Sequence, residues 1–328
     1  MRYSSETYRG VRVLVTGATG FVGRWVALAL SRAGADLFVN AREVESLKRV
    51  YVQWGIQAKP LISDLSRRGT FRYVFREAQP AVIFHLTGYG VDPLERDETT
   101  MRRINVELTE EIVETIAMHA DTSGWPGLRL LSAGSAFEYG IQDGPISETS
   151  EPTPNSSYAL TKLEGTRCIQ AARERSGFRG TTARLTTVYG PGEHPSRLLP
   201  SLLRTVETSE PLELTGGKQE RDFTFVGDVA EGFLRLGALG DVPHGVVNLA
   251  TGRLSTVRSF VDCAREVLGI RADLLRLGAI PYRDNEVWQG RIDVDLLENL
   301  TGWRPRIGID SGIAMSRDFL AAEAMSSQ

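Results

Sequence analysis

The feature that most constrains this chain is a glycine-rich turn between an apolar run and an amphipathic segment close to the N-terminus. Residues 11–26 read VRVLVTGATGFVGRWV, with glycines at positions 17, 20 and 23. Gly17 permits a tight turn, Gly20 lets backbone N–H groups approach a pyrophosphate, and Gly23 lets the following helix pack closely on the strand. The N-terminus of that helix then faces the anion, so this order predicts a dinucleotide-binding βα unit.

The first half of the chain alternates β-branched runs with amphipathic stretches, which is typical of a parallel sheet with helices on both faces. The expected strands are Val11–Thr16, Asp36–Asn40, Ala81–Leu86, Arg129–Ser132 and Thr181–Leu185. The expected helices are Val22–Ala33, Leu47–Trp54, Thr70–Ala78, Thr100–His119 and Ser157–Ser176. This pattern predicts an α/β fold built as a Rossmann doubly wound parallel sheet.

The texture of the sequence changes after about Val188. Pro and Gly are spaced through YGPGEHPSRLLP and LTGGKQERDF, and short apolar runs such as VVNLA follow. We therefore expect a Rossmann domain over residues 1–187 and a smaller C-terminal α/β substrate lobe, mainly residues 188–328. A segment at about 223–250 is expected to return to the Rossmann domain.

Charge and cysteine usage exclude several classes of function. The chain of 328 residues carries 38 Lys and Arg against 41 Asp and Glu, so it offers no excess of positive charge to nucleic acid. Its two cysteines, Cys168 and Cys263, lie far apart in the sequence. They cannot build a disulfide framework or a cysteine metal site, which favours a reducing cytoplasm.

Metal and membrane signals are also lacking in the sequence. His85 and His119 do not have metal-ligand spacing, so no catalytic metal is expected. No apolar run approaches the roughly 18 residues of a membrane helix. The polar start MRYSSETYRG lacks the apolar core of a signal peptide, so we expect no membrane association and a cytoplasmic location.

The end of the second expected strand indicates which dinucleotide binds. This position usually carries an acidic residue for the adenosine ribose, but here it is Asn40, and Arg42 follows. Asn40 can bind a ribose hydroxyl without repelling a 2′-phosphate, and Arg42 can pair with that phosphate through its planar guanidinium. NADP(H) is therefore the favoured cofactor. If Arg42 is only a solvated loop cation, NAD(H) is an alternative cofactor. Asp64, after the third apolar run, is placed to accept a hydrogen bond from the adenine amino group.

A second pattern, Tyr158-Ala-Leu-Thr-Lys162, places a phenol and an ammonium group on one face of a helix. The Lys charge, added to that of an oxidised nicotinamide, lowers the pKa of the phenol, so that Tyr158 can exchange a proton with a substrate near neutral pH. The run LLSAGSAFEYG leaves an expected strand and offers the hydroxyls of Ser132 and Ser135 to the same substrate oxygen. A Tyr and a Lys at this spacing occur by chance on many exposed helices. Here the dinucleotide loop earlier in the chain favours a catalytic interpretation.

Motifs spread along the chain occur in the order and spacing of a known family. They are Gly17-x-x-Gly20-x-x-Gly23, Asp64-Leu65, His85-Leu86-Thr87-Gly88, Asn105, Ser135-Ala-Phe-Glu-Tyr139-Gly140, Tyr158-x-x-x-Lys162 and Arg184-x-x-x-x-Tyr189-Gly190-Pro191. Over nearly its whole length the chain resembles the nucleotide-sugar epimerase, dehydratase and reductase branch of the extended short-chain dehydrogenase/reductases. The resemblance implies a Rossmann domain that binds NAD(P) and a C-terminal lobe that binds a nucleoside-diphosphate sugar.

The resemblance also assigns roles to residues. It implies that Tyr158 is the acid/base, that Lys162 lowers the Tyr158 pKa and holds the nicotinamide ribose, and that Ser135 binds the substrate oxygen. Asn105 would line the site beneath the sugar or brace the sheet. The residues implied to bind the cofactor are Gly17, Gly20, Phe21, Val22, Gly23, Asn40, Arg42, Asp64, Leu65, Leu86, Thr87, Gly88, Asn105, Tyr158, Lys162 and Val188.

For the diphosphate of the sugar nucleotide, the resemblance points to Arg221 and Arg283, with Arg197 as a further candidate. A diphosphate needs cations held by rigid elements, although surface salt bridges are the alternative interpretation for each Arg. In many relatives the last expected strand continues with Phe-Asn, whereas this chain has Thr186 and Thr187. Thr187 replaces the missing amide only in part, so the identity of the nucleotide base and of the sugar is not determined by the sequence.

Hydride transfer is common to this branch, so other positions choose among reduction, epimerisation and dehydration. The resemblance associates 4,6-dehydration with a carboxylate where this chain has Phe137, and Glu138 lies on the opposite face of a segment expected to be extended. Epimerisation at C3 and C5 would need an additional group such as His194, which is expected in a loop. What remains is an NADPH-dependent 4-ketoreductase of a 4-keto-6-deoxy sugar, favoured by Asn40 and Arg42, or an NAD-dependent C4-epimerase.

Two other classes fit the residues less well. Relatives that bind a dinucleotide without turnover commonly lose Tyr or Lys, whereas this chain keeps Tyr158 and Lys162. An enzyme acting on a steroid or flavonoid ketone would have no use for Arg221 and Arg283. A nucleotide-sugar enzyme therefore accounts for more of the sequence.

The expected association state depends on the two helices at Thr100–His119 and Ser157–Ser176. The first carries an apolar stripe at three- and four-residue steps, formed by Ile104, Leu108, Ile112, Thr115 and Ile116. This stripe can be explained by packing against the chain's own sheet, without a second copy. The resemblance implies that the two helices pair with their mates across a two-fold axis, so a homodimer is expected.

Overall fold

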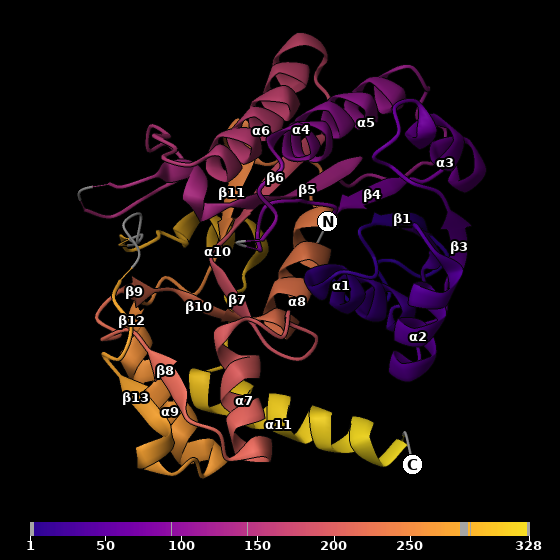
Figure 1. Cartoon of the computed structure of the whole chain (residues 1–328). Coiled ribbons are helices and arrows are strands. Elements are labelled where there is room, and N and C mark those ends of the chain that lie inside the picture. The colour runs from indigo at the N-terminus through magenta and orange to yellow at the C-terminus, as the bar shows by residue number, and fades with distance from the viewer. Residues whose placement is uncertain (1–2, 93, 143, 283–287, 289, 327–328) are drawn as a thin grey trace.

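A seven-stranded parallel sheet forms the centre of the molecule (Figure 1). The computed structural model describes residues 3–92, 94–142, 144–282, 288 and 290–326. The strand order is β11-β6-β5-β4-β1-β2-β3, and every neighbouring pair is parallel. The strands are β1 (Arg12–Thr16), β2 (Asp36–Ala41), β3 (Lys59–Ile62), β4 (Val82–His85), β5 (Leu130–Ser135), β6 (Gly180–Leu185) and β11 (Val246–Leu249). The predicted Rossmann fold is confirmed.

Helices cover both faces of this sheet. One face packs against α1 (Phe21–Arg32), α2 (Val44–Trp54) and α8 (Val226–Gly237). The other packs against α3 (Thr70–Ala78), α5 (Leu108–Ala117) and α6 (Ser157–Ser176). In β1, Val13 and Val15 join the first core and Leu14 joins the second, as the two-residue period of a strand requires. A continuous apolar run with both faces covered is what a central parallel strand needs.

The helix expected at Thr100–His119 runs from Glu98 to Ala117 and has a π-helical stretch in its middle. It consists of α4 (Glu98–Arg102), a π-helical segment (Arg103–Glu107) and α5. The apolar stripe on it is buried against the sheet of its own chain, in the core that also holds Phe71 and Val74 of α3. The stripe therefore supplies no surface for a second copy.

The C-terminal lobe has a core of its own beside β7 (Thr187–Tyr189) and β10 (Phe223–Phe225). In it Phe223 stacks on Phe260 with ring centroids 4.4 Å apart. The remaining elements are α7 (Leu198–Thr208), β8 (Leu212–Leu214), β9 (Glu220–Arg221), β12 (Ser255–Thr256), α9 (Val257–Leu268), β13 (Leu275–Leu277), α10 (Asp295–Thr301) and α11 (Ile309–Ser326). Figure 1 shows α7, α9 and α11 grouped away from the central sheet, while α8 and β11 return to it. None of the described helices has the length and apolar character needed to cross a membrane.

Candidate active site

The glycine turn after β1 forms a close backbone cradle at the carboxyl end of the sheet. Gly17 has a φ of +68°, and a Cβ built on it would lie 2.6 Å from the backbone of Leu86 and Thr87. A Cβ on Gly23 would overlap the Gly17 carbonyl. Gly20 is the N-cap of α1, which has no side-chain cap and no acidic residue in its first turn. Positions 17 and 23 therefore need glycine.

The cradle fits the pyrophosphate of a dinucleotide. The open N-terminus of α1 presents backbone N–H groups and the positive end of its dipole. Beside it, the Oγ1 atom of Thr87 is buried without a hydrogen-bond partner in the described part of the chain. Phe21 and Val22 begin α1 and pack against the core of the lobe, as does Val188 of β7. The residues predicted to hold the cofactor on this side therefore line adjoining ends of β1, β4 and β7.

The side chain of Asn40 is more engaged than the sequence suggested. Its amide nitrogen donates to the carbonyl oxygens of Leu61 and Ser63, both at 3.1 Å, and to the Ser63 hydroxyl at 2.8 Å. Asn40 thus fastens β2 to the end of β3, and only its Oδ1 atom is left for a ribose hydroxyl. Arg42 lies just beyond β2 and is exposed, which suits a residue that meets a ligand phosphate.

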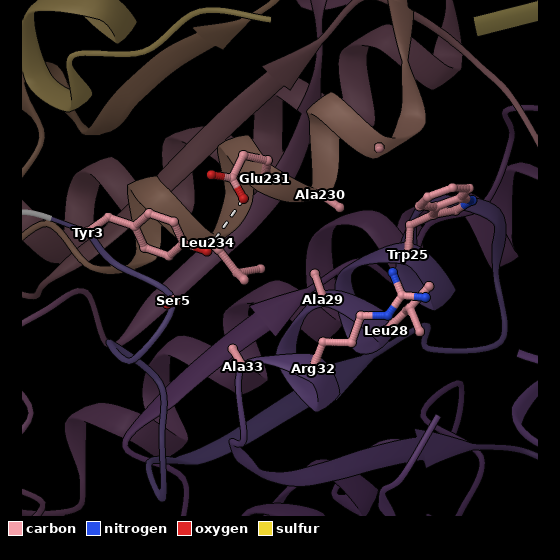
Figure 2. A pocket seen from close by; sticks show the side chains of 11 residues that line it. Tyr3, Ser5, Trp25, Leu28, Ala29, Arg32, Ala33, Ala230, Glu231 and Leu234 are labelled. Atoms are coloured by element: carbon pink, nitrogen blue, oxygen red, sulfur yellow. Dashed lines mark hydrogen bonds between the residues drawn. The ribbon is translucent and has the colours of Figure 1, made fainter. Parts of the chain in front are cut away.

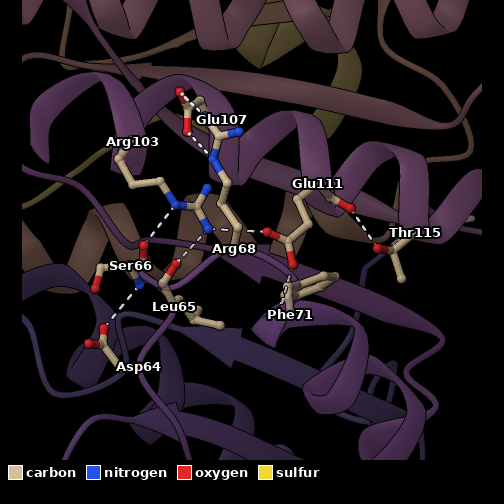
Figure 3. A network of polar contacts seen from close by, with 9 residues as sticks. All are labelled: Asp64, Leu65, Ser66, Arg68, Phe71, Arg103, Glu107, Glu111 and Thr115. Atoms are coloured by element: carbon tan, nitrogen blue, oxygen red, sulfur yellow. Dashed lines mark hydrogen bonds and ion pairs between the residues drawn. The ribbon is translucent and has the colours of Figure 1, made fainter. Parts of the chain in front are cut away.

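The loop that carries Asp64 and Leu65 is held by a network of polar contacts (Figure 3). Arg103 donates to the carbonyl oxygens of Leu65 and Ser66 at 3.1 and 2.8 Å, and it pairs with Glu111 at 3.1 Å. Hydrogen bonds from Ser66 lower the pKa of Asp64. The loop is therefore tied to the π-helical segment, with Asp64 kept ionised as an acceptor.

Asn105 braces the loop after β4. Its Oδ1 accepts from the Tyr89 N–H at 3.0 Å, and its Nδ2 donates to the Tyr89 carbonyl at 2.9 Å and to Thr161 at 3.1 Å. The side chain is buried. Of the two roles that the sequence allowed, the contacts support the brace, which links Gly88 and its neighbours to α6.

Ser135, Tyr158 and Lys162 come together where β5 ends and α6 begins. Ser156 caps α6 by accepting a hydrogen bond from Ala159 at 3.2 Å, which fixes the first turn that holds Tyr158. The Ser135 hydroxyl lies near enough to the Tyr158 phenol to lower its pKa. The Lys162 ammonium donates to the Ala133 carbonyl at 2.5 Å. The Ser135 hydroxyl, the Tyr158 phenol and the Lys162 ammonium group therefore lie at the junction of β5 and α6.

The electrostatic balance at Tyr158 differs from the sequence expectation. Burial is the largest influence and raises the pKa of Tyr158 to about 12, while the hydrogen bond from Ser135 and the charge of Arg197 oppose it. Burial also lowers the pKa of Lys162. Lys162 is not among the main influences on the Tyr158 pKa, and its ammonium group donates to the Ala133 carbonyl. The phenol is a proton donor in this state.

The predicted substrate residues are distributed over the lobe. Arg197 is the N-cap residue of α7, pairs with Glu193 at 3.4 Å and acts on Tyr158, so it lies closer to the reactive hydroxyls than the sequence indicated. Arg221 lies in β9, where its guanidinium donates to the Glu220 carbonyl at 2.7 Å. Thr187 begins β7 and is partly buried. Arg283 lies outside the described residues.

The segment after Ser135 is not extended. Residues Ala136–Tyr139 form a 3₁₀ turn, so the expectation that Glu138 sits on the opposite face of an extended segment is wrong in its geometry. Glu138 is fully buried and pairs with Arg184 at 2.8 Å. Phe137 is 40% exposed and packs edge-on against the Tyr158 ring, with centroids 6.3 Å apart. An apolar ring thus occupies the place where the resemblance puts the carboxylate of a 4,6-dehydratase.

Sequence patterns did not reveal the contacts between two loops beside this site. His194 pairs with Asp92 at 3.1 Å, which joins the loop after β7 to the loop after β4. Glu193 precedes His194 in the chain; its side chain is buried, and its Oε2 atom has no hydrogen-bond partner among the described residues. Burial raises the pKa of Glu193 to about 7. The only signal for these residues was their position in the GPGEH run.

A separate groove of about 310 Å³ lies between α1 and α8. Figure 2 shows it lined by Trp25, Arg32, Glu231 and their neighbours, with Tyr3 hydrogen-bonded to Glu231 at 3.4 Å. None of the predicted site residues lines this groove. Ser135, Tyr158 and Lys162 therefore lie at the carboxyl edge of the sheet and not in this groove.

Comparison with known proteins agrees with this geometry. Residues 13–250 match the sequence profile of the NAD dependent epimerase/dehydratase family. The chain belongs to that family. The resemblance inferred from the motifs is thereby confirmed, and with it the prediction that the chain is an NAD(P)-dependent enzyme.

Several family members align over most of the chain. The dTDP-6-deoxy-L-talose 4-dehydrogenase (NAD(P)(+)) of Kitasatospora kifunensis is 28% identical over 90% of this chain and 91% of its own length. The UDP-glucuronate 4-epimerase 1 of Arabidopsis thaliana is 26% identical over 95% of this chain and 78% of its own length. The structure of MoeE5 in complex with UDP-glucose and NAD has a TM-score of 0.79 and 27% identity, covering 95% of this chain and 99% of MoeE5.

Proposed function

We propose that this enzyme is an NADPH-dependent 4-ketoreductase of a nucleoside-diphosphate 4-keto-6-deoxy sugar. The observation that carries the proposal is the position of Ser135, Tyr158 and Lys162 at the end of β5 and the start of α6, at the sheet edge that also bears the glycine cradle. Phe137 beside Tyr158 leaves the site without a second group able to move protons at the position that dehydration needs. Chemistry at C4 therefore fits better than elimination.

The residues can act on a C4 carbonyl in a simple way. The Ser135 and Tyr158 hydroxyls donate hydrogen bonds to the ketone oxygen and polarise the carbonyl. NADPH, when bound at the cradle, supplies the hydride. As the oxygen gains charge, Tyr158 gives it the phenolic proton, and the product leaves as an alcohol. The ammonium group of Lys162 stabilises the phenolate that remains.

A reduction suits the protonated phenol of this site. Because burial raises the pKa of Tyr158 to about 12, the resting group is the acid that ketone reduction needs. Asn40 and Arg42 support NADP(H), since neither repels a 2′-phosphate and the exposed guanidinium of Arg42 can bind one. The dehydrogenase from Kitasatospora, which is named for a reaction at C4 of a 6-deoxy sugar nucleotide, adds support.

An NAD-dependent C4-epimerase is the second candidate. It is favoured by the epimerase named above and by the NAD in the MoeE5 complex. The dinucleotide released on denaturing the purified protein discriminates between them. Tightly held NAD would favour the epimerase, whereas an empty site or a preference for NADPH is expected for the reductase.

The acid role of Tyr158 is tested by Tyr158→Phe. We expect turnover of a 4-keto sugar nucleotide to fall by about 10²–10⁴-fold, with dinucleotide affinity retained, because this is the usual contribution of general acid catalysis. Tyr139→Phe is the matched control, since it removes the phenol that donates to Asn248 at 2.7 Å away from the reactive hydroxyls. Near-normal turnover of Tyr158→Phe would exclude this mechanism.

The substrate class is tested at Arg221. If its guanidinium holds the diphosphate, Arg221→Ala and Arg283→Ala should each weaken nucleotide-sugar affinity about ten- to hundredfold, which corresponds to roughly 1.5–3 kcal/mol for a bond between charged groups. NADPH affinity should hardly change. A free nucleoside diphosphate should compete with the sugar substrate in the wild type and lose potency in both variants. No competition would mean that the substrate carries no diphosphate at these positions.

We also propose a homodimer that works in the cytoplasm. The buried stripe on α5 gives no support, so the dimer would use the outer sides of α5 and α6, where Leu160 is 45% exposed. Glu110, Glu114 and Arg167 are exposed on the same two helices and offer charges of both signs to a two-fold mate. The two free cysteines suit a reducing compartment.

A further inference from the structure

We propose that Glu138 is a positioning residue for this reaction: its buried carboxylate fixes Ser135 and places a negative charge next to Tyr158 and Lys162. The proposal rests on the function proposed above, because it concerns the same reactive hydroxyl groups. It assigns a task to a fully buried carboxylate that no step of the mechanism uses.

The two oxygens of Glu138 bind three different elements. Oε1 accepts from the Ser135 N–H at 2.8 Å. Oε2 accepts from the Thr166 hydroxyl at 3.0 Å and from Arg184 at 2.8 Å. Thr166 lies one helical turn after Lys162 on α6, and Arg184 lies on β6. One carboxylate therefore connects the strand end that carries Ser135 to the helix that carries Tyr158 and Lys162.

The chain makes room for this carboxylate with a glycine. A Cβ built on Gly134 would overlap the Thr182 methyl group and would lie 2.7 Å from Glu138 Oε1 and 3.3 Å from the Arg184 side chain. The Ser135 hydroxyl accepts from the Phe137 N–H at 3.2 Å, and together with the Glu138 carboxylate it forms a capping box that fixes the start of the 3₁₀ turn. The Ser135 side chain is thereby held at a defined distance from Tyr158.

The polar groups that act on Tyr158 come from three parts of the chain. Ser135 and Glu138 belong to the end of β5 and its turn, Arg197 to the start of α7, and Glu95 to the loop after β4. Burial raises the Tyr158 pKa most, and the two carboxylates raise it further, while Ser135 and Arg197 lower it. Loss of the Glu138 charge should therefore lower the Tyr158 pKa.

Lys162 and Glu138 are themselves surrounded by charged and titratable groups. Burial lowers the pKa of Lys162, and Glu138 is the anion that raises it again. Burial and the Lys162 charge hold the pKa of His85 at about 3, so His85 stays neutral. Arg184 pairs with Glu138 and stacks over the Tyr139 ring at 4.2 Å. The negative charge of Glu138 thus stabilises both Arg184 and the protonated form of Lys162.

The test is the pH profile of ketone reduction in Glu138→Gln. Reduction needs a protonated Tyr158, so activity falls as pH rises through the pKa of that group in the complex. Removing the Glu138 charge should move this alkaline limb to lower pH by about one unit, the size of shift that a nearby charge produces. The value of kcat should fall more than tenfold with KM little changed, because the amide has one acceptor oxygen where the carboxylate has two, so it cannot accept from both the Ser135 N–H and Arg184. A limb that stays at the wild-type pH would overturn the proposal.

Two further variants separate electrostatics from folding. In Glu138→Gln with Arg184→Gln no buried guanidinium is left unpaired, so the fold is kept and the limb should still be displaced. Glu148→Gln is the matched control, because Glu148 accepts from Asn248 at 2.8 Å in the neighbouring network and does not act on Tyr158. An equal displacement in Glu148→Gln, or none in the double variant, would overturn the proposal.

A readout without turnover keeps the two proposals apart. Nuclear magnetic resonance of isotope-labelled tyrosine, assigned with Tyr158→Phe, reports the phenol titration with oxidised dinucleotide bound. If no 4-keto sugar is reduced but the Tyr158 signal titrates at lower pH in Glu138→Gln, the proposed function fails and the role of Glu138 stands. If sugar is reduced and the signal does not move, only the role of Glu138 is refuted.

Discussion

Two glycines with the same backbone conformation allow the cradle to be tested apart from backbone strain. Gly17 and Gly10 have φ values of +68° and +70°. A Cβ on Gly17 meets three backbone atoms of Leu86 and Thr87 at 2.6 Å, whereas nothing lies within 4 Å of one on Gly10. Both Ala variants carry the left-handed penalty of about 1–2 kcal/mol. Only Gly17→Ala adds overpacking against rigid backbone, worth about 1–3 kcal/mol.

The free energy of unfolding should therefore fall by about 1–2 kcal/mol in Gly10→Ala and by about 2–5 kcal/mol in Gly17→Ala. Urea unfolding of the two variants and the wild type measures this difference. A fluorescence titration with dinucleotide should show affinity retained in Gly10→Ala and lost in Gly17→Ala, because the turn that approaches the pyrophosphate is displaced. Equal destabilisation, or normal dinucleotide binding by Gly17→Ala, would refute the close approach.

Three further outcomes are expected. Asn40→Asp with Arg42→Ala should shift the kcat/KM ratio from NADPH towards NADH; an unchanged ratio would move the selector to Arg24, which donates to the Thr19 carbonyl at 2.8 Å. Sedimentation at micromolar concentration should give a dimer, and a clean monomer would exclude the proposed pairing. Burial raises the pKa of Glu193 to about 7, so the folded state holds a proton that the unfolded state has released, and wild-type stability falls as pH rises from about 4.5 through 7. Relative to the wild type, Glu193→Gln should therefore gain about 2–4 kcal/mol between pH 5 and pH 8; an unchanged difference would contradict the buried charge.

The strands of the first half could be predicted because apolar runs and turns recur in a regular order. β3 was not expected as a strand, since Lys59–Ile62 is largely exposed at the sheet edge and contains Pro60, so it lacks the alternation of a half-buried strand. β11 pairs with β6, with Val246 opposite Thr182. Periodicity reports whether a run is apolar, but it does not identify its partner, which tertiary packing decides.

The reactive groups were predictable to a different degree. Tyr158 and Lys162 follow from helical spacing, which the structure keeps within α6. The burial of Glu138 was not predictable, because a strand that turns into a 3₁₀ helix reverses the side that each residue faces. The same holds for Lys162 and the Ala133 carbonyl, a contact between α6 and β5 that no local pattern encodes.

The lobe and the sheet are joined at the residue after Arg221, which explains how a diphosphate site could be held in register with the reactive hydroxyls. Asp222 is fully buried, and its carboxylate accepts from the N–H groups of Thr251, Gly252 and Arg253 at 3.0, 2.7 and 3.2 Å. Its carbonyl accepts from the Thr187 N–H at 3.0 Å. The backbone that carries Arg221 is therefore fixed both to the segment after β11 and to β7, so its position relative to the end of the sheet is set by buried hydrogen bonds and not by a flexible hinge.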